Sequence, residues 1–62
     1  MRYTVNLKVT TRDYVVAEPH EVSAGNRKSA ETIAAAEAIN SHGRDNITEI
    51  SVISVSEVRA NA

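Results

Sequence analysis

The chain has 62 residues, no cysteine and a formal net charge of −1, from seven Lys and Arg and eight Asp and Glu residues. This length predicts a single domain over residues 1–62, and the lack of cysteine excludes disulfides and cysteine-ligated zinc. The balanced charge argues against nucleic-acid binding, which usually needs a basic face. No apolar run has the length of a signal peptide or a membrane span, so we expect a cytoplasmic protein without membrane contact.

The residues available for a core are small, because the chain has two Tyr but no Phe or Trp. A domain of this size buries only about 60% of the surface that its unfolded chain exposes. Small apolar side chains also bury little area each, which leaves a marginal core. Oligomerisation is a common remedy, and we therefore expect a homodimer or a bound partner protein.

The first part of the chain predicts two strands. Residues 3–10 alternate apolar and polar side chains, the pattern of a strand with one buried face. Residues 11–13 form a short polar break, and a second strand is predicted over residues 14–22. Pro19 lies inside this second strand and cannot donate a ladder hydrogen bond, so the strand belongs at a sheet edge or carries a bulge.

Residues 27–41 predict an Ala-rich helix. Ser23 or Asn26 is the expected N-cap, and Gly43 is the expected left-handed residue that ends the helix. On a helical wheel, one broad face is apolar, and we expect an Ala-rich face to let the helix lie close upon the sheet. The members of the broad face are Ile33, Ala36 and Ile39, together with Thr32.

Residues 44–46 predict a loop, residues 47–58 the last strand, and residues 59–62 a frayed tail. The last strand changes phase in its middle. Ile50 and Val52 share one face, whereas Ile53 and Val55 share the other. Either a β-bulge near Val52 and Ile53 resets the pleat, or both faces are covered, one by the helix and one by a partner.

Together the elements predict an α+β fold, a two-layer ββαβ sandwich. Pro19 favours the second strand as an edge, so the first strand is central and the third pairs with its free side. The result is a three-stranded antiparallel sheet in the order 2-1-3, with one helix on one face. The alternative order 1-2-3 is disfavoured, because it would make the proline-containing strand central.

In this arrangement the third strand is an open edge of about 12 residues, with Glu49 and Glu57 as its only charges. Long, weakly charged edges pair readily with another chain. We therefore predict contact by strand addition, with a second copy or with a target protein. The alternative is that a bulge and the Ser side chains keep the edge solvated. The residues that we expect to bind the partner are Ile53, Val55, Arg44 and Glu49.

The start of the helix suggests an alternative function. Two cations stand in the first turn, where the helix dipole disfavours positive charge by a few tenths of a kcal/mol. An anion bound at the helix N-terminus would explain them, although two solvated side chains would as well. The glycines of a phosphate loop are missing. The alternative is therefore a homo-oligomer that binds a small anion such as a nucleotide, with Asn26, Arg27 and Lys28 as ligands.

No segment predicts an active site or a metal centre. Glu18 and His20 share a strand face, as two metal ligands would, but no third ligand is evident, so a surface pair is expected. Ser41, His42 and Asp45 are triad residue types, yet they stand side by side in one loop rather than on separate rigid elements. We accordingly expect a protein that is not an enzyme and needs no cofactor or metal.

The sequence resembles small bacteriophage-encoded host-takeover proteins. The likeness lies in a strand that ends in Glu21-Val22-Ser23-Ala24, a polar turn, a helix that opens near Ser29-Ala30-Glu31, and a final Val-rich strand. It covers roughly residues 14–58. Proteins of this kind include inhibitors of bacterial RNA polymerase and anti-defence proteins such as anti-CRISPRs. The resemblance implies an inhibitor that docks on a host or defence enzyme, and it assigns no site residue.

Overall fold

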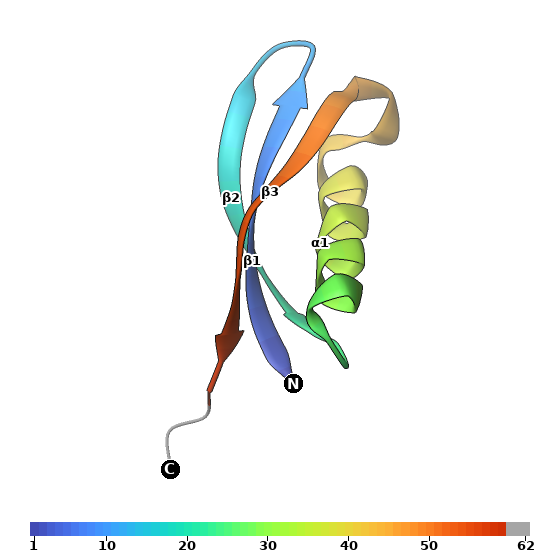
Figure 1. Ribbon diagram of the computed structural model, residues 1–62. Helices are drawn as coiled ribbons and strands as arrows, with labels where there is room; N and C mark the ends of the chain where they lie inside the picture. Colours follow the sequence, from blue (N-terminus) through green and yellow to red (C-terminus); the bar gives the residue numbers. More distant parts are fainter. Residues whose placement is uncertain (60–62) are drawn as a thin grey trace.

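A computed structural model describes residues 1–59 of the chain (Figure 1). The elements in chain order are β1 (Arg2–Thr11), β2 (Val15–Ser23), α1 (Arg27–His42), a short 3-10 turn η1 (Arg44–Asn46) and β3 (Ile47–Val58). The predicted loop at residues 44–46 is thus a single tight turn. Of the predicted frayed tail, residues 60–62 lie outside the described residues.

The three strands form one antiparallel sheet in the order β2-β1-β3, which confirms the predicted α+β architecture and excludes the order 1-2-3. Pro19 lies on β2 opposite Asn6, on an edge strand as expected. The helix covers one face of this sheet (Figure 1). β2 and β3 are therefore the two edges of the sheet, and β1 lies between them.

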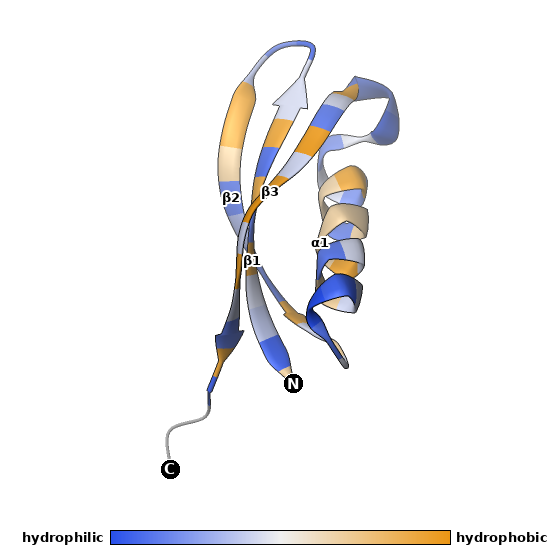
Figure 2. Ribbon diagram, viewed as in Figure 1, coloured by the Kyte–Doolittle hydropathy of each residue, from blue (hydrophilic) through white to orange (hydrophobic). Residues whose placement is uncertain are grey.

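The core is built on alternate residues of β1. Val5, Leu7 and Val9 are completely buried, and Tyr3 is nearly so, because their side chains face α1. The residues between them are polar and remain at least partly exposed on the other face of the sheet. Figure 2 shows this alternation as separate hydrophobic and hydrophilic bands along the strands. One solvated face is normal for an antiparallel sheet and needs no partner to cover it.

The helix presents a different face to the sheet than the wheel predicted. Its fully buried residues are Ala30, Ala34 and Ala38, whereas Ile33 is 37% exposed and Ala36 is exposed. Ile39, the third predicted member, is only half-buried. The wheel therefore gave the wrong face, although an Ala-rich face does lie close to the sheet as expected. Methyl groups spaced four residues apart let the helix approach β1 closely, and the larger β1 side chains fill the space between.

Both ends of α1 are capped. The Asn26 side chain accepts a hydrogen bond from the Ser29 amide over 2.8 Å, which confirms Asn26 as the N-cap. Gly43 follows the helix with φ 88° and ψ 125°, so its φ is positive as expected but its ψ lies outside the left-handed helical region. A Cβ atom at this position would lie 3.2 Å from the Asn46 side-chain nitrogen, which makes glycine the fitting residue there.

The phase change in β3 is a register shift. Asn6 of β1 lies opposite Ser54, but the next residue, Leu7, lies opposite Val52, so Ile53 has no partner. A second shift near the start of β3 skips Thr48 in the same way. These extra residues behave as β-bulges. They bring apolar residues at uneven spacing to the helix side, where Ile47, Ile50 and Val55 pack against the core.

The alanine face of α1 provides a direct test of the packing. Ala34→Leu should destabilise the fold by about 1–3 kcal/mol or more, because a fully buried methyl site against β1 has no room for an isobutyl group. Ala36→Leu is the matched control, since position 36 is exposed on the same helix. Urea unfolding followed by circular dichroism measures both. Equal stability of the two variants would contradict the close approach of helix and strand.

Candidate functional site

Two features lie beside the helix, one on each side. Toward β2, five side chains form a connected polar group, here called the imidazole–carboxylate cluster: Tyr14, Glu18, His20, Glu37 and His42. Toward β3, an open depression of about 370 Å³, here called the isoleucine hollow, is lined by Ile39, Arg44, Ile47, Thr48, Glu49 and Ile50.

The cluster joins the edge strand β2 to the C-terminal half of α1. Glu18 and His20 lie opposite Leu7 and Val5 of the core, so they point to the helix side of the sheet. Glu18 contacts both histidines through its two oxygens, at 2.5 Å to His20 Nε2 and 2.6 Å to His42 Nε2. The pair that the sequence placed on the surface is in fact mostly buried, with side-chain exposures of 21% and 12%.

The outer members complete the network. His20 Nδ1 lies 3.0 Å from a Glu37 oxygen, and His42 Nδ1 lies 2.7 Å from the Tyr14 hydroxyl. Since an ionised carboxylate only accepts hydrogen bonds, both nitrogens of His20 must donate, which makes it an imidazolium. For His42, a neutral ring satisfies both contacts, with Nε2–H donating to Glu18 and Nδ1 accepting from Tyr14. We assign this tautomer from the hydrogen-bond partners.

The charges in the cluster shift two pKa values. Burial by itself lowers the pKa of His20, but the hydrogen bonds and charges of Glu37 and Glu18 more than offset it, and the net pKa is raised above 6.5. Burial likewise raises the pKa of Glu18, but the hydrogen bonds from His42 and His20 outweigh it, and the net pKa is lowered below 4.5. Both groups are therefore more strongly charged in the fold than in the unfolded chain.

The cluster supplies the third side chain that the sequence lacked beside Glu18 and His20, namely His42. Two imidazoles and a carboxylate are ligand types that zinc accepts. Within residues 1–59, however, no three His, Asp or Glu side chains are arranged to hold a metal ion. Each Nε2 occupies a different oxygen of Glu18 at hydrogen-bonding distance. The arrangement therefore fastens the helix to β2 through hydrogen bonds.

No sequence signal marks this cluster as a unit. Period-two alternation places Glu18 and His20 on one strand face, but His42 and Glu37 reach them only through the packing of α1 across the sheet. The sequence placed His42 only among the triad residue types of the loop that follows the helix. The one available hint is that the chain has only two histidines and that each lies within three residues of a carboxylate in the sequence.

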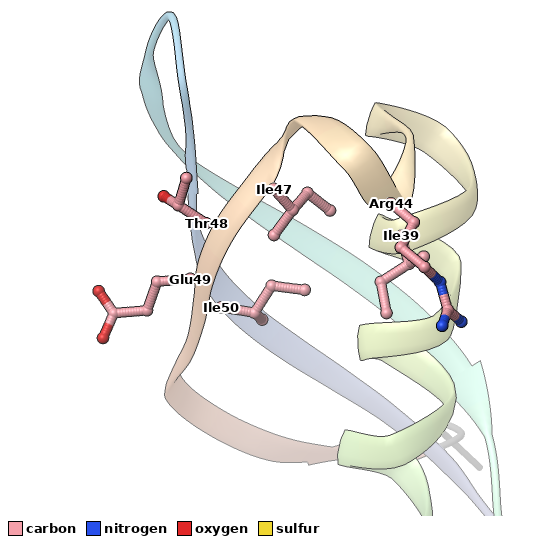
Figure 3. A pocket seen from close by; sticks show the side chains of 6 residues that line it. All are labelled: Ile39, Arg44, Ile47, Thr48, Glu49 and Ile50. Atoms are coloured by element: carbon pink, nitrogen blue, oxygen red, sulfur yellow. The ribbon is translucent and has the colours of Figure 1, made fainter.

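The isoleucine hollow lies between the end of α1 and the beginning of β3. Ile39, Ile47 and Ile50 point toward one another there, whereas Thr48 and Glu49 point away on the other side of the strand (Figure 3). Arg44 extends from η1 at the rim (Figure 3). Among residues 1–59 no carboxylate forms an ion pair with Arg44. The hollow thus combines an apolar floor with one unpaired cation.

The structure separates the four residues expected to bind a partner. Arg44 and Glu49 both line the hollow. Ile53 is the extra residue of the register shift and is 58% exposed. Val55 is half-buried and packs against the core, so it is the one member of the set whose side chain faces inward.

The residues of the alternative anion site have contacts of their own. Asn26 caps the helix through its side-chain oxygen, and Arg27 donates a hydrogen bond to the Val55 carbonyl of β3 over 3.0 Å. Lys28 is exposed. The anion hypothesis remains a prediction. The contacts of Asn26 and Arg27 are to other parts of the chain and give it no further support. The Arg27 contact instead ties the start of the helix to the second half of β3.

Comparisons with models of protein families, with curated proteins and with solved structures found no match for this chain. No helix within residues 1–59 is long and apolar enough to cross a membrane.

The cluster predicts a pH optimum of stability. The Glu18 contribution is present above pH 4.5 and is lost as the pH falls through its lowered pKa. The His20 contribution is complete below pH 6.5 and is lost as the pH rises through its raised pKa. Stability should be greatest between these values and decline toward pH 8.5, by at most about 1.4 kcal/mol per pH unit for one proton.

Urea unfolding between pH 5.5 and 8.5 tests the alkaline part of this prediction. His20→Asn should be less stable than the parent at pH 5.5 and should show a smaller alkaline decline. Glu21→Gln is the control, because Glu21 lies on the same strand as His20 and the change breaks only the exposed ion pair with Arg2 of β1. An alkaline decline that is the same in the parent and in His20→Asn would show that His20 is not the linked group.

Proposed function

We propose that this chain is a small, non-enzymatic protein-binding module that docks on a partner by adding a strand to the edge of β3. The observation that carries the proposal is the combination of an unpaired edge with an apolar hollow beside it. In strand addition, backbone hydrogen bonds supply affinity and pockets for alternate side chains supply specificity. β3 offers both in the segment from Ile47 to Ile53, before the Val55 carbonyl that Arg27 contacts.

The contrast between the two edges supports the choice of β3. β2 carries Pro19 near its middle, which removes a backbone donor from that edge, and its helix-side face is occupied by the cluster. β3 has no proline, and Val52, Ile53 and Val58 are each more than 40% exposed. Exposed apolar side chains on an unprotected edge mark a surface for pairing.

The proposal extends to the kind of partner. The resemblance to small phage proteins favours an inhibitor that docks on a host or defence enzyme, and the small core favours a protein that gains stability from a bound partner. Self-association through the same edge gives a homodimer by the same chemistry. The two alternatives, a different protein or a second copy, are distinguished by the mass of the purified protein in solution, which is that of a monomer in the first case and of a dimer in the second.

Ile53→Lys is the substitution that tests the edge. Because Ile53 is 58% exposed and has no partner on β1, a Lys there should fold normally while placing a charge in the path of an added strand. Val55→Lys is less suitable, since Val55 packs against the core. The matched control is Val15→Lys, which replaces a residue 59% exposed on the opposite edge.

Each tagged variant is used to capture proteins from bacterial lysate, and each is also examined by analytical ultracentrifugation. We expect a polypeptide retained near stoichiometry by the parent and by Val15→Lys, and reduced at least tenfold with Ile53→Lys. If the parent is instead a dimer, Ile53→Lys should make it monomeric. Retention and mass that are unchanged by Ile53→Lys would contradict docking at β3.

A further inference from the structure

We propose that the isoleucine hollow binds the C-terminal end of an extended polypeptide, with an aliphatic side chain on the three isoleucines and the terminal carboxylate on Arg44. This inference rests on the proposed function, because the peptide is the strand that adds to β3. It names the chemistry of the partner at that edge.

The apolar part of the site is formed by side chains from two elements. Ile47 and Ile50 lie on the helix side of β3, and Ile39 of α1 faces them across the hollow (Figure 3). All three are only half-buried, so they keep accessible apolar surface. A volume of about 370 Å³ lies within the range of ligand pockets and accommodates an aliphatic side chain with adjoining backbone.

The direction of an added strand places its end at this hollow. Antiparallel pairing is the more stable arrangement per residue. A strand antiparallel to β3 would run from the Val52 level back toward Ile47, the first residue of β3. Its C-terminal end therefore lies next to η1. Side chains that the added strand directs to the helix side lie over Ile50 and Ile47, beside Ile39.

Charge complementarity identifies the terminal group. Arg44 is exposed at the rim of the hollow, and within residues 1–59 it has no ion-pair partner. The one acidic lining residue, Glu49, does not oppose an incoming carboxylate on the apolar side, because its side chain points away from the isoleucines (Figure 3). A guanidinium binds a carboxylate through paired hydrogen bonds, which fixes its position as well as its charge.

The test uses a defined probe, the N-acetylated peptide Lys-Thr-Lys-Ile-Thr-Val, and the same peptide as its C-terminal amide. The two differ in the terminal charge alone. Each is titrated to millimolar concentration while the isoleucine methyl resonances of the protein are followed by NMR. We expect the free acid to shift the methyl signals of Ile39, Ile47 and Ile50 and to leave Ile33, on the exposed side of α1, unchanged.

The free acid should bind roughly tenfold more tightly than the amide, the usual difference for a charge-assisted contact. Arg44→Ala should abolish this difference, and Lys28→Ala, which removes an exposed cation near the other end of α1, should preserve it. Equal binding of acid and amide to the parent, or no methyl shifts at millimolar peptide, would overturn the proposal. Such a result would leave docking at β3 intact, provided that in the capture experiment Ile53→Lys loses the partner and Val15→Lys keeps it.

Discussion

The close packing of α1 on β1 is the constraint on which the other features depend. Ala30, Ala34 and Ala38 form a narrow ridge of methyl groups that rests on the fully buried side chains of β1. A ridge this narrow covers the central strand but leaves the spaces above both flanking strands to be filled by other side chains. On the β2 side those side chains are polar and hydrogen-bonded, and on the β3 side they are three isoleucines around an open hollow.

The two sides of the helix therefore have different properties. The cluster is closed in the sense that every side-chain nitrogen and oxygen buried within residues 1–59 has a hydrogen-bond partner. Its energy depends on protonation, so it links the attachment of α1 to pH. The hollow is open to solvent, and covering its apolar side chains would lower the free energy by removing apolar surface from water. One side of the helix is closed by hydrogen bonds, whereas the other leaves apolar side chains accessible to solvent.

The sequence was sufficient for the architecture because each element carried a local signal. Alternation in β1, Pro19 in β2 and glycine at position 43 led to the correct strand order and helix end. The helix face was missed because the Ala-rich helix has apolar residues on more than one face, and only tertiary packing shows that Ala30, Ala34 and Ala38 approach the sheet. The cluster was missed because its members meet only after tertiary packing. The phase change in β3 was visible in the sequence, but only backbone pairing shows that Ile53 is the extra residue.

Pro19 has a consequence for the type of assembly that this chain can form. A filament of copies requires two complementary surfaces on each molecule, so that the edge of one copy joins the opposite edge of the next. Here the opposite edge is interrupted at Pro19, where the backbone offers no donor. Arg27 also occupies the Val55 carbonyl in the second half of β3. Pairing at β3, as proposed above, would therefore stop after one added strand, because neither the opposite edge nor the second half of β3 continues the ladder.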